Sequence, residues 1–180
     1  MTEQCDMTAA PRDEALERLL VSYQNYYNIK TDGVEAPFAA EAEFHTHGER
    51  YFLMKSARLS SEDAHEYVYF AVVPRLTAEL FGELDETAWE RGTAKVEPKP
   101  DHKSSDVALL IIADEIEKDA VTALKKSKHY KSYKNRIWGW SQYRVIAFDL
   151  GTGKTVYNRL GKPLKKLVSN INGHKTAKAN

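Results

Sequence analysis

Cysteine and long apolar runs are nearly absent from this sequence. Cys5 is the only cysteine in 180 residues, so no disulfide can form within the chain, and we interpret it as a terminal thiol. No stretch reaches the roughly 18 consecutive apolar residues that a membrane-spanning helix needs. The first residues also lack a basic segment followed by an apolar one. These absences predict a cytoplasmic protein with no membrane partner.

Acidic residues are scarce in the second half of the chain, although the formal net charge is zero. Residues 1–97 carry 9 Lys or Arg against 19 Asp or Glu, whereas residues 98–180 carry 17 against 7. Asp149 is the only acid after Asp119. Such an asymmetry can attract an anionic partner to one side of the molecule. It also favours a homodimer, because a two-fold axis can set one molecule's acidic patch against its mate's basic patch.

The overall composition is that of a folded globular domain. Hydrophobic residues make up 42% of the chain, which contains 6 Phe, 3 Trp and 10 Tyr, and such values argue against disorder. The length suits one domain, since domains commonly span about 100 to 150 residues. We expect a single domain over residues 11–171, after a flexible segment at 1–10 and before a disordered tail at 172–180.

Two different periodicities occur near the N-terminus. Apolar residues at helical spacing after Pro11 predict a helix that ends near Asn28. From Phe38 to His45, apolar and polar residues alternate, which predicts a half-buried strand.

A three-stranded meander is predicted next. If residues 47–48 form a turn, Ala42 faces Leu53 on a following strand. A third strand over residues 66–73 would then complete the meander, and Pro74 would end it.

The second half of the chain predicts helices that alternate with strands. Residues 76–88 and 116–129 have helical spacing, whereas 107–113 is an uninterrupted apolar run typical of a central strand. A hairpin at 143–158 and a last helix at 163–171 follow. We therefore predict an α+β domain with a mixed, mostly antiparallel sheet of about five to six strands and about four helices.

The string FDLGTGKT contains fragments of two phosphate-binding motifs. A P-loop needs a glycine where Phe148 stands. The DLGTG part resembles the phosphate hairpin of the actin, Hsp70 and sugar-kinase superfamily, but only about 25 residues follow it, too few for the large domains such a fold requires. We interpret Gly151 and Gly153 as a plain turn. A magnesium nuclease is not favoured either, because no strand carries the (D/E)xK pattern.

Histidines and acids alternate in EAEFHTHGE. Residues two apart on a strand share a face, so Glu43, His45 and His47 would point the same way. Such a set is typical of zinc, iron or manganese ligands, and it is our candidate metal site. An ordinary polar sheet face is the competing interpretation.

Basic and aromatic residues are interleaved at 125–144. Basic side chains neutralise phosphates and aromatic rings stack on bases, a combination typical of proteins that bind RNA or single-stranded DNA. The candidate phosphate contacts are Lys125, Lys128, Lys131, Lys134 and Arg136. In the competing interpretation the aromatics pack in the core and the lysines form a solvated rim.

The chain resembles a family of bacterial proteins known only as a domain of unknown function. The similar blocks are EFHTHGERYFLMKSARL, KPDHKSSDVALLIIAD, KSYK, WGWSQYR and NRLGKPL, and they cover most of residues 12–170. The resemblance implies no activity, and we expect no cofactor. It implies that the family pattern includes His102, Lys131, Ser132, Tyr133 and Trp140.

Three functional hypotheses follow. The first is a non-catalytic domain that binds a ligand or a protein in a groove. The residues proposed to bind that ligand are His102, Lys131, Tyr133, Trp138 and Trp140. The second is nucleic-acid binding through residues 125–144. The third is a metal-dependent enzyme that uses His45 and His47. We expect a binding protein rather than an enzyme.

Overall fold

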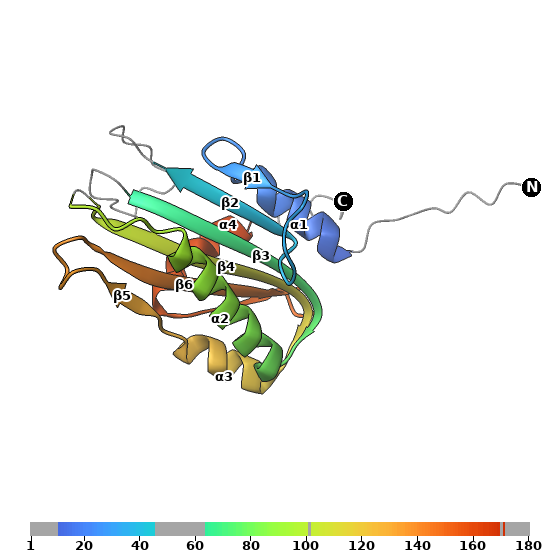
Figure 1. Cartoon of the computed structure of the whole chain (residues 1–180). Coiled ribbons are helices and arrows are strands. Elements are labelled where there is room, and N and C mark those ends of the chain that lie inside the picture. Colours follow the sequence, from blue (N-terminus) through green and yellow to red (C-terminus); the bar gives the residue numbers. More distant parts are fainter. Residues whose placement is uncertain (1–10, 46–63, 101, 170, 172–180) are drawn as a thin grey trace, which may run out of the picture.

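A computed structural model describes residues 11–45, 64–100, 102–169 and 171 (Figure 1). Within this part of the chain, seven strands form one sheet and helices pack on both of its faces. The strands are β1 (Asn28–Lys30), β2 (Ala40–His45), β3 (Ala64–Leu76), β4 (Ser104–Ile116), β5 (Tyr130–Ser132), β6 (Trp140–Asp149) and β7 (Lys154–Tyr157). The helices are α1 (Pro11–Val21), α2 (Ala78–Ala94), α3 (Lys118–Lys126), the 3-10 helix η1 (Arg159–Leu164) and α4 (Lys165–Ser169).

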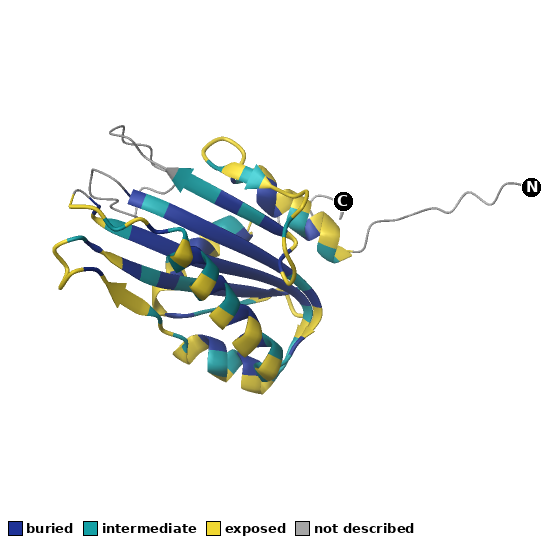
Figure 2. Ribbon diagram, in the orientation of Figure 1, coloured by how far each residue is buried: buried dark blue, intermediate teal, exposed yellow. Residues whose placement is uncertain are grey.

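The sheet lies between two hydrophobic cores, because its central strands are apolar on both faces. One core joins α2 and α3 to odd-numbered sheet residues such as Leu109 and Val145. The other joins α1, η1 and α4 to even-numbered residues such as Leu110 and Ile146. In Figure 2 the three central strands are largely buried, whereas β5 at one side of the sheet is exposed.

The order of the strands is β1-β2-β3-β4-β6-β5, and β7 also pairs with β6. Four of the six pairings are antiparallel, but the two longest, β3–β4 and β4–β6, are parallel. Their register aligns His65 with Ser105 and Ser105 with Ser141. The three parallel strands therefore begin at the same end of the sheet.

The α+β class and the mixed sheet are confirmed, while several local predictions are wrong. The first helix ends at Val21. The predicted partner of Ala42 was Leu53, but Ala42 pairs with Ile29 of β1 and Val68 of β3, so both edges of β2 are occupied at this position. Strand β3 continues through Pro74 to Leu76.

The charge asymmetry of the sequence recurs at the two edges of the sheet, although the acidic helix α2 packs against the basic helix α3. The acid-rich first half supplies β1 and β2 at one edge, and the base-rich second half supplies β5 and β7 at the other. In Figure 1, α3 and β5 lie on the side of the molecule away from α1 and β1.

Candidate functional site

The β5–β6 hairpin has a turn with unusual backbone geometry. Lys134, Asn135 and Arg136 have φ angles of 46°, 54° and 72°, in the left-handed region that residues other than glycine rarely adopt. The turn is held by backbone hydrogen bonds, among them Tyr133 N to Gly139 O at 3.0 Å. Left-handed residues persist where the surrounding structure holds them, and they cluster at functional sites.

A buried polar network fixes this hairpin to the starts of the parallel strands. His102 is 5% exposed, and its ring nitrogens lie 2.7 Å from the Trp138 carbonyl oxygen and 2.8 Å from Ser105 Oγ. Tyr133, 8% exposed, shares a hydrogen bond of 2.9 Å with Ser141 Oγ. The His102 and Tyr133 rings meet edge to face at 5.7 Å. These contacts make the hairpin a rigid support for the residues that it exposes.

Two aromatic rings are exposed on one face of the hairpin. Tyr130 is 49% exposed and Trp140 is 38% exposed. Tyr130 pairs with Gln142 and Ser132 pairs with Trp140, so both rings belong to the face that Gln142 also occupies. This is the face on which α1 and α4 pack further along the sheet.

Five exposed cations lie in and beside the hairpin, but not all on the face of the two rings: Lys131 pairs with Ser141, so its side chain leaves the opposite face of the sheet. They are Lys125 and Lys128, at and after the end of α3, Lys131 on β5, and Lys134 and Arg136 in the turn. Within the described chain none of the five forms an ion pair. Lys134 Nζ lies 3.9 Å from the centroid of the Trp138 ring, and Arg136 Cζ lies 5.9 Å from that of Tyr130. We call the five cations together with Tyr130 and Trp140 the basic-aromatic edge.

Behind the two rings, buried charges continue across the same sheet face. Register places Glu66, Asp106, Gln142 and Tyr130 side by side on β3, β4, β6 and β5. Arg144 Nη2 lies 2.5 Å from Asp106 Oδ2, and Arg144 Nη1 lies 3.9 Å from Glu66 Oε1. The side chains in this row pass from buried at Glu66 and Asp106 to exposed at Tyr130.

Burial shifts the pKa values of the charged groups in this row. It raises the pKa of Glu66 above its ordinary range, more than the neighbouring Arg144 lowers it. It likewise raises the pKa of Asp106, while Arg144 and a hydrogen bond from Gln142 oppose that rise. Burial alone would lower the pKa of Arg144, but the two carboxylates raise it. A charged Arg144 thus favours the ionised forms of both acids.

The candidate ligand residues gather around the hairpin, but they do not line one surface. His102 and Tyr133 are buried, and Trp138 is half-buried beneath Lys134. Lys131 and Trp140 are exposed on the two adjoining strands. His102 and Tyr133 therefore support the hairpin from below, whereas Lys131 and Trp140 are accessible to a ligand.

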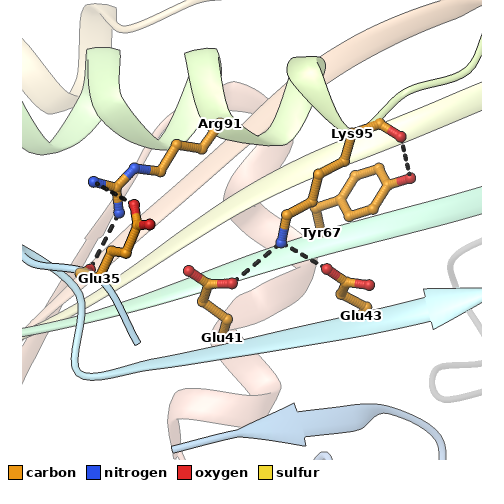
Figure 3. Close-up of polar contacts among 6 residues, drawn as sticks. All are labelled: Glu35, Glu41, Glu43, Tyr67, Arg91 and Lys95. Carbon is orange, nitrogen blue, oxygen red and sulfur yellow. Dashed lines mark hydrogen bonds and ion pairs between the residues drawn. The ribbon is translucent and has the colours of Figure 1, made fainter. Parts of the chain in front are cut away.

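The candidate metal site is only partly visible, because His47 lies outside the described residues and the side chain of His45 is not described. Figure 3 shows Glu43 bound by Lys95, which follows α2. Lys95 Nζ lies 2.6 Å from Glu43 Oε1 and 3.1 Å from Glu41 Oε2. Among the described side chains, no group of three His, Cys, Asp or Glu could hold a metal ion. The metal hypothesis stays a prediction.

The GTGK segment forms the predicted turn, between β6 and β7. Asp149 caps it: Oδ1 accepts from Thr152 N at 2.8 Å and the carbonyl oxygen accepts from Gly153 N at 2.8 Å. These backbone donors are thus occupied within the turn itself. Gly153, with a φ of 67°, supplies the left-handed residue that the turn requires.

Sequence reasoning missed Gln142 and the buried charges behind it. A signal was nevertheless present, because Glu66, Asp106 and Arg144 each stand just before or within the apolar part of a strand. A charge inside such a run must find a partner. The sequence did not show which strands lie side by side or in which register they pair.

Comparisons with known proteins identify a family but no function. Within the described part of the chain, no helix is both long and apolar enough to cross a membrane. No curated protein and no solved structure matches the chain significantly. The family model described as "Domain of unknown function (DUF8052)" matches residues 12–170. The chain therefore belongs to this family of unknown function.

Proposed function

We propose that this domain is a non-catalytic binding protein whose ligand is single-stranded nucleic acid, held at the basic-aromatic edge. The observation that carries the proposal is the exposure of Tyr130 and Trp140 on one sheet face, at an edge whose cations have no acidic partner in the described chain. Rings that can stack on bases and cations that can neutralise phosphates are the two components such binding needs.

The hairpin geometry supports a preformed surface. The His102 and Tyr133 contacts fix the turn before any ligand arrives. Fewer rotatable groups then have to be ordered on binding, which lowers the entropic cost of association.

Further basic residues lie beyond the hairpin on the α1 and α4 side. Four exposed cations follow β7 on η1 and α4, namely Arg159, Lys162, Lys165 and Lys166. η1 contacts β6 directly. These cations extend the positive surface along which a phosphate backbone could run.

The test compares two substitutions of Trp140 in binding to a fluorescently labelled single-stranded RNA. Trp140→Ala removes a stacking partner and should weaken binding by about 1 to 3 kcal/mol, roughly five- to 150-fold. Trp140→Phe keeps an aromatic face and should retain most of the affinity. Equal affinities for wild type, Trp140→Ala and Trp140→Phe would contradict the proposal, as would the absence of binding at low salt.

A further inference from the structure

Ile137 is an apolar residue that the fold leaves uncovered. It lies in the turn between β5 and β6 and is 70% exposed, more than any other large apolar residue in the part of the chain that the structure describes. Figure 2 shows that this turn is largely exposed, and residues 134–137 all are. Apolar surface in contact with water is unfavourable, and Ile137 belongs to neither of the two hydrophobic cores. Its side chain is therefore available to a partner.

The turn holds Ile137 at a fixed place. The three residues before it, 134–136, have left-handed backbone angles, which persist only where the surrounding structure enforces them. Ile137 N donates a hydrogen bond of 3.0 Å to the Lys134 carbonyl oxygen. At the base of the turn, a Cβ on Gly139 would collide with the Lys103 carbonyl oxygen, so the turn packs directly on the segment before β4. Ile137 thus extends from a rigid tip.

Two cations of the same turn flank Ile137. Lys134 Nζ lies 3.9 Å from the centroid of the Trp138 ring, and Arg136 Cζ lies 5.9 Å from that of Tyr130. These ring contacts keep each cation beside the hairpin, where both are exposed. The tip therefore presents one apolar side chain between two positive charges.

Nucleic acid fits this combination better than a bilayer does. The cations would attract the phosphates of either partner. One isoleucine buries too little apolar area to hold a domain in a bilayer, which takes a whole apolar helix face or an acyl chain. A single side chain of this kind is enough, however, to enter between two stacked bases. The exposed rings of Tyr130 and Trp140 lie on the strands directly behind the turn, where a single strand that left the tip would reach them.

We infer that Ile137 is a wedge that enters the last base step of a duplex, so that the domain binds junctions between single-stranded and double-stranded nucleic acid. The inference rests on the proposed function. Entry of an apolar side chain unstacks the bases on either side of it, and contacts between cations and phosphates offset the cost of unstacking. The freed strand would then stack on Tyr130 and Trp140, which replaces part of the stacking lost from the duplex.

The experiment uses the full chain and an RNA duplex with a single-stranded overhang. The fluorescent base 2-aminopurine, which brightens when its neighbours no longer stack on it, is placed in the base pair next to the overhang or in the middle of the duplex. Wild type should raise the fluorescence at the junction and leave it unchanged in the middle. This comparison uses wild type alone, so it does not depend on how any variant folds.

Ile137→Ser removes the apolar side chain but keeps the cations and the rings. It should bind a plain single strand as wild type does, lose the rise in fluorescence at the junction and bind the junction about fivefold more weakly, because less apolar surface is buried. Ile137→Leu keeps an apolar side chain and should behave like wild type. Val21→Ser, the matched control, removes another exposed apolar side chain at the end of α1 and should change neither measurement.

Failure of the inference is distinguishable from failure of the proposed function. If neither the junction nor the single strand binds at low salt, the proposed function fails and the inference fails with it. If the single strand binds but wild type leaves the junction fluorescence unchanged, or if Ile137→Ser raises it as much as wild type does, nucleic-acid binding stands and the wedge is overturned. Binding to anionic lipid vesicles that Ile137→Ser abolishes, with no effect on the junction, would also overturn it in favour of a membrane contact.

Discussion

At the scale of single residues, Arg144 supplies the counter-charge to two buried acids. It is the cation that contacts both buried acids, Glu66 and Asp106. Arg144→Met should lower the free energy of unfolding by about 3 to 5 kcal/mol, because it leaves buried carboxylates without a counter-charge. Chemical denaturation would measure this loss. Arg159→Met, at an exposed position without an ion pair in the described chain, should change stability by less than about 0.5 kcal/mol, and equal effects of the two substitutions would refute the assignment.

Glu66 adds a pH dependence of predictable sign. Burial raises the pKa of its carboxyl group in the folded state. Glu66 therefore binds its proton more tightly in the folded than in the unfolded protein. The stabilisation from this proton is complete below the pKa that Glu66 has in the unfolded state, and it is lost as the pH rises through the pKa of the folded state. Relative to Glu66→Gln, wild type should lose unfolding free energy from about pH 4 upward. Melting curves of both proteins across that range would measure the difference, and a constant difference would contradict the shift.

Two glycines of α2 form a matched pair. A Cβ at Gly92 would lie 2.6 Å from the Val107 side chain, whereas a Cβ at Gly82 would meet nothing within 4 Å. Gly92→Ala should destabilise the fold by about 1 to 3 kcal/mol through overpacking. Gly82→Ala should instead stabilise it by about 0.5 to 1 kcal/mol, because alanine favours the helix. Thermal unfolding of both variants checks the contrast, and a gain at Gly92 would show that α2 is not packed tightly on β4.

At the scale of elements, Lys95 fastens α2 to β2. Burial alone would lower the pKa of Lys95, yet its hydrogen bonds to Glu43 and Glu41 raise it above the ordinary value. Lys95→Met should lower stability by about 1 kcal/mol, a modest loss because this side chain is partly exposed. Lys99→Met removes a lysine whose partner Glu97 is largely exposed and should have almost no effect. Equal denaturation midpoints for Lys95→Met and wild type would show that the contacts of Lys95 with Glu41 and Glu43 do not stabilise the fold.

Long elements could be predicted from the sequence, while short ones could not. The apolar run at 107–113 predicted a central strand, and β4 is one. β1 and β5 have three residues each, too few to show a period. The pairing of β2 with β3 depends on contacts far apart in the chain, and the alternation in the sequence fits several partners equally well.

The position of the candidate site was predictable from the sequence, but which of its residues are exposed and which support the hairpin was not. The interleaved composition of 125–144 indicated where cations and rings occur. Only the register of β5 on β6 shows that Tyr130 and Trp140 share a face while Tyr133 turns to Ser141 on the other. His102 was identified as a possible ligand contact, and the structure places it beneath the hairpin because its partners Ser105 and Trp138 come from two other segments.

At the scale of the whole molecule, the two edges of the sheet come from oppositely charged halves of the chain. The edge at β1 and β2 belongs to the acidic half and the edge at β5 and β7 to the basic half. This arrangement would also suit an edge-to-edge homodimer, which stays a prediction. Light scattering should then give a mass that falls from dimer to monomer as salt increases, since salt screens the attraction. A mass that does not change with salt would contradict the homodimer, and the charged edges would then be available to a different partner.

The most direct test of nucleic-acid binding uses one charge reversal at each edge of the sheet. Lys131 on β5 and Lys30 on β1 are both exposed lysines on short edge strands. Binding of a labelled single-stranded RNA would be followed by fluorescence anisotropy across a salt series. If the account is right, Lys131→Glu weakens binding and flattens the log-log salt dependence by about 0.7, the value for one phosphate contact on a single strand, while Lys30→Glu binds like wild type. Equal behaviour of the two variants, or a wild-type affinity that does not change with salt, would contradict it.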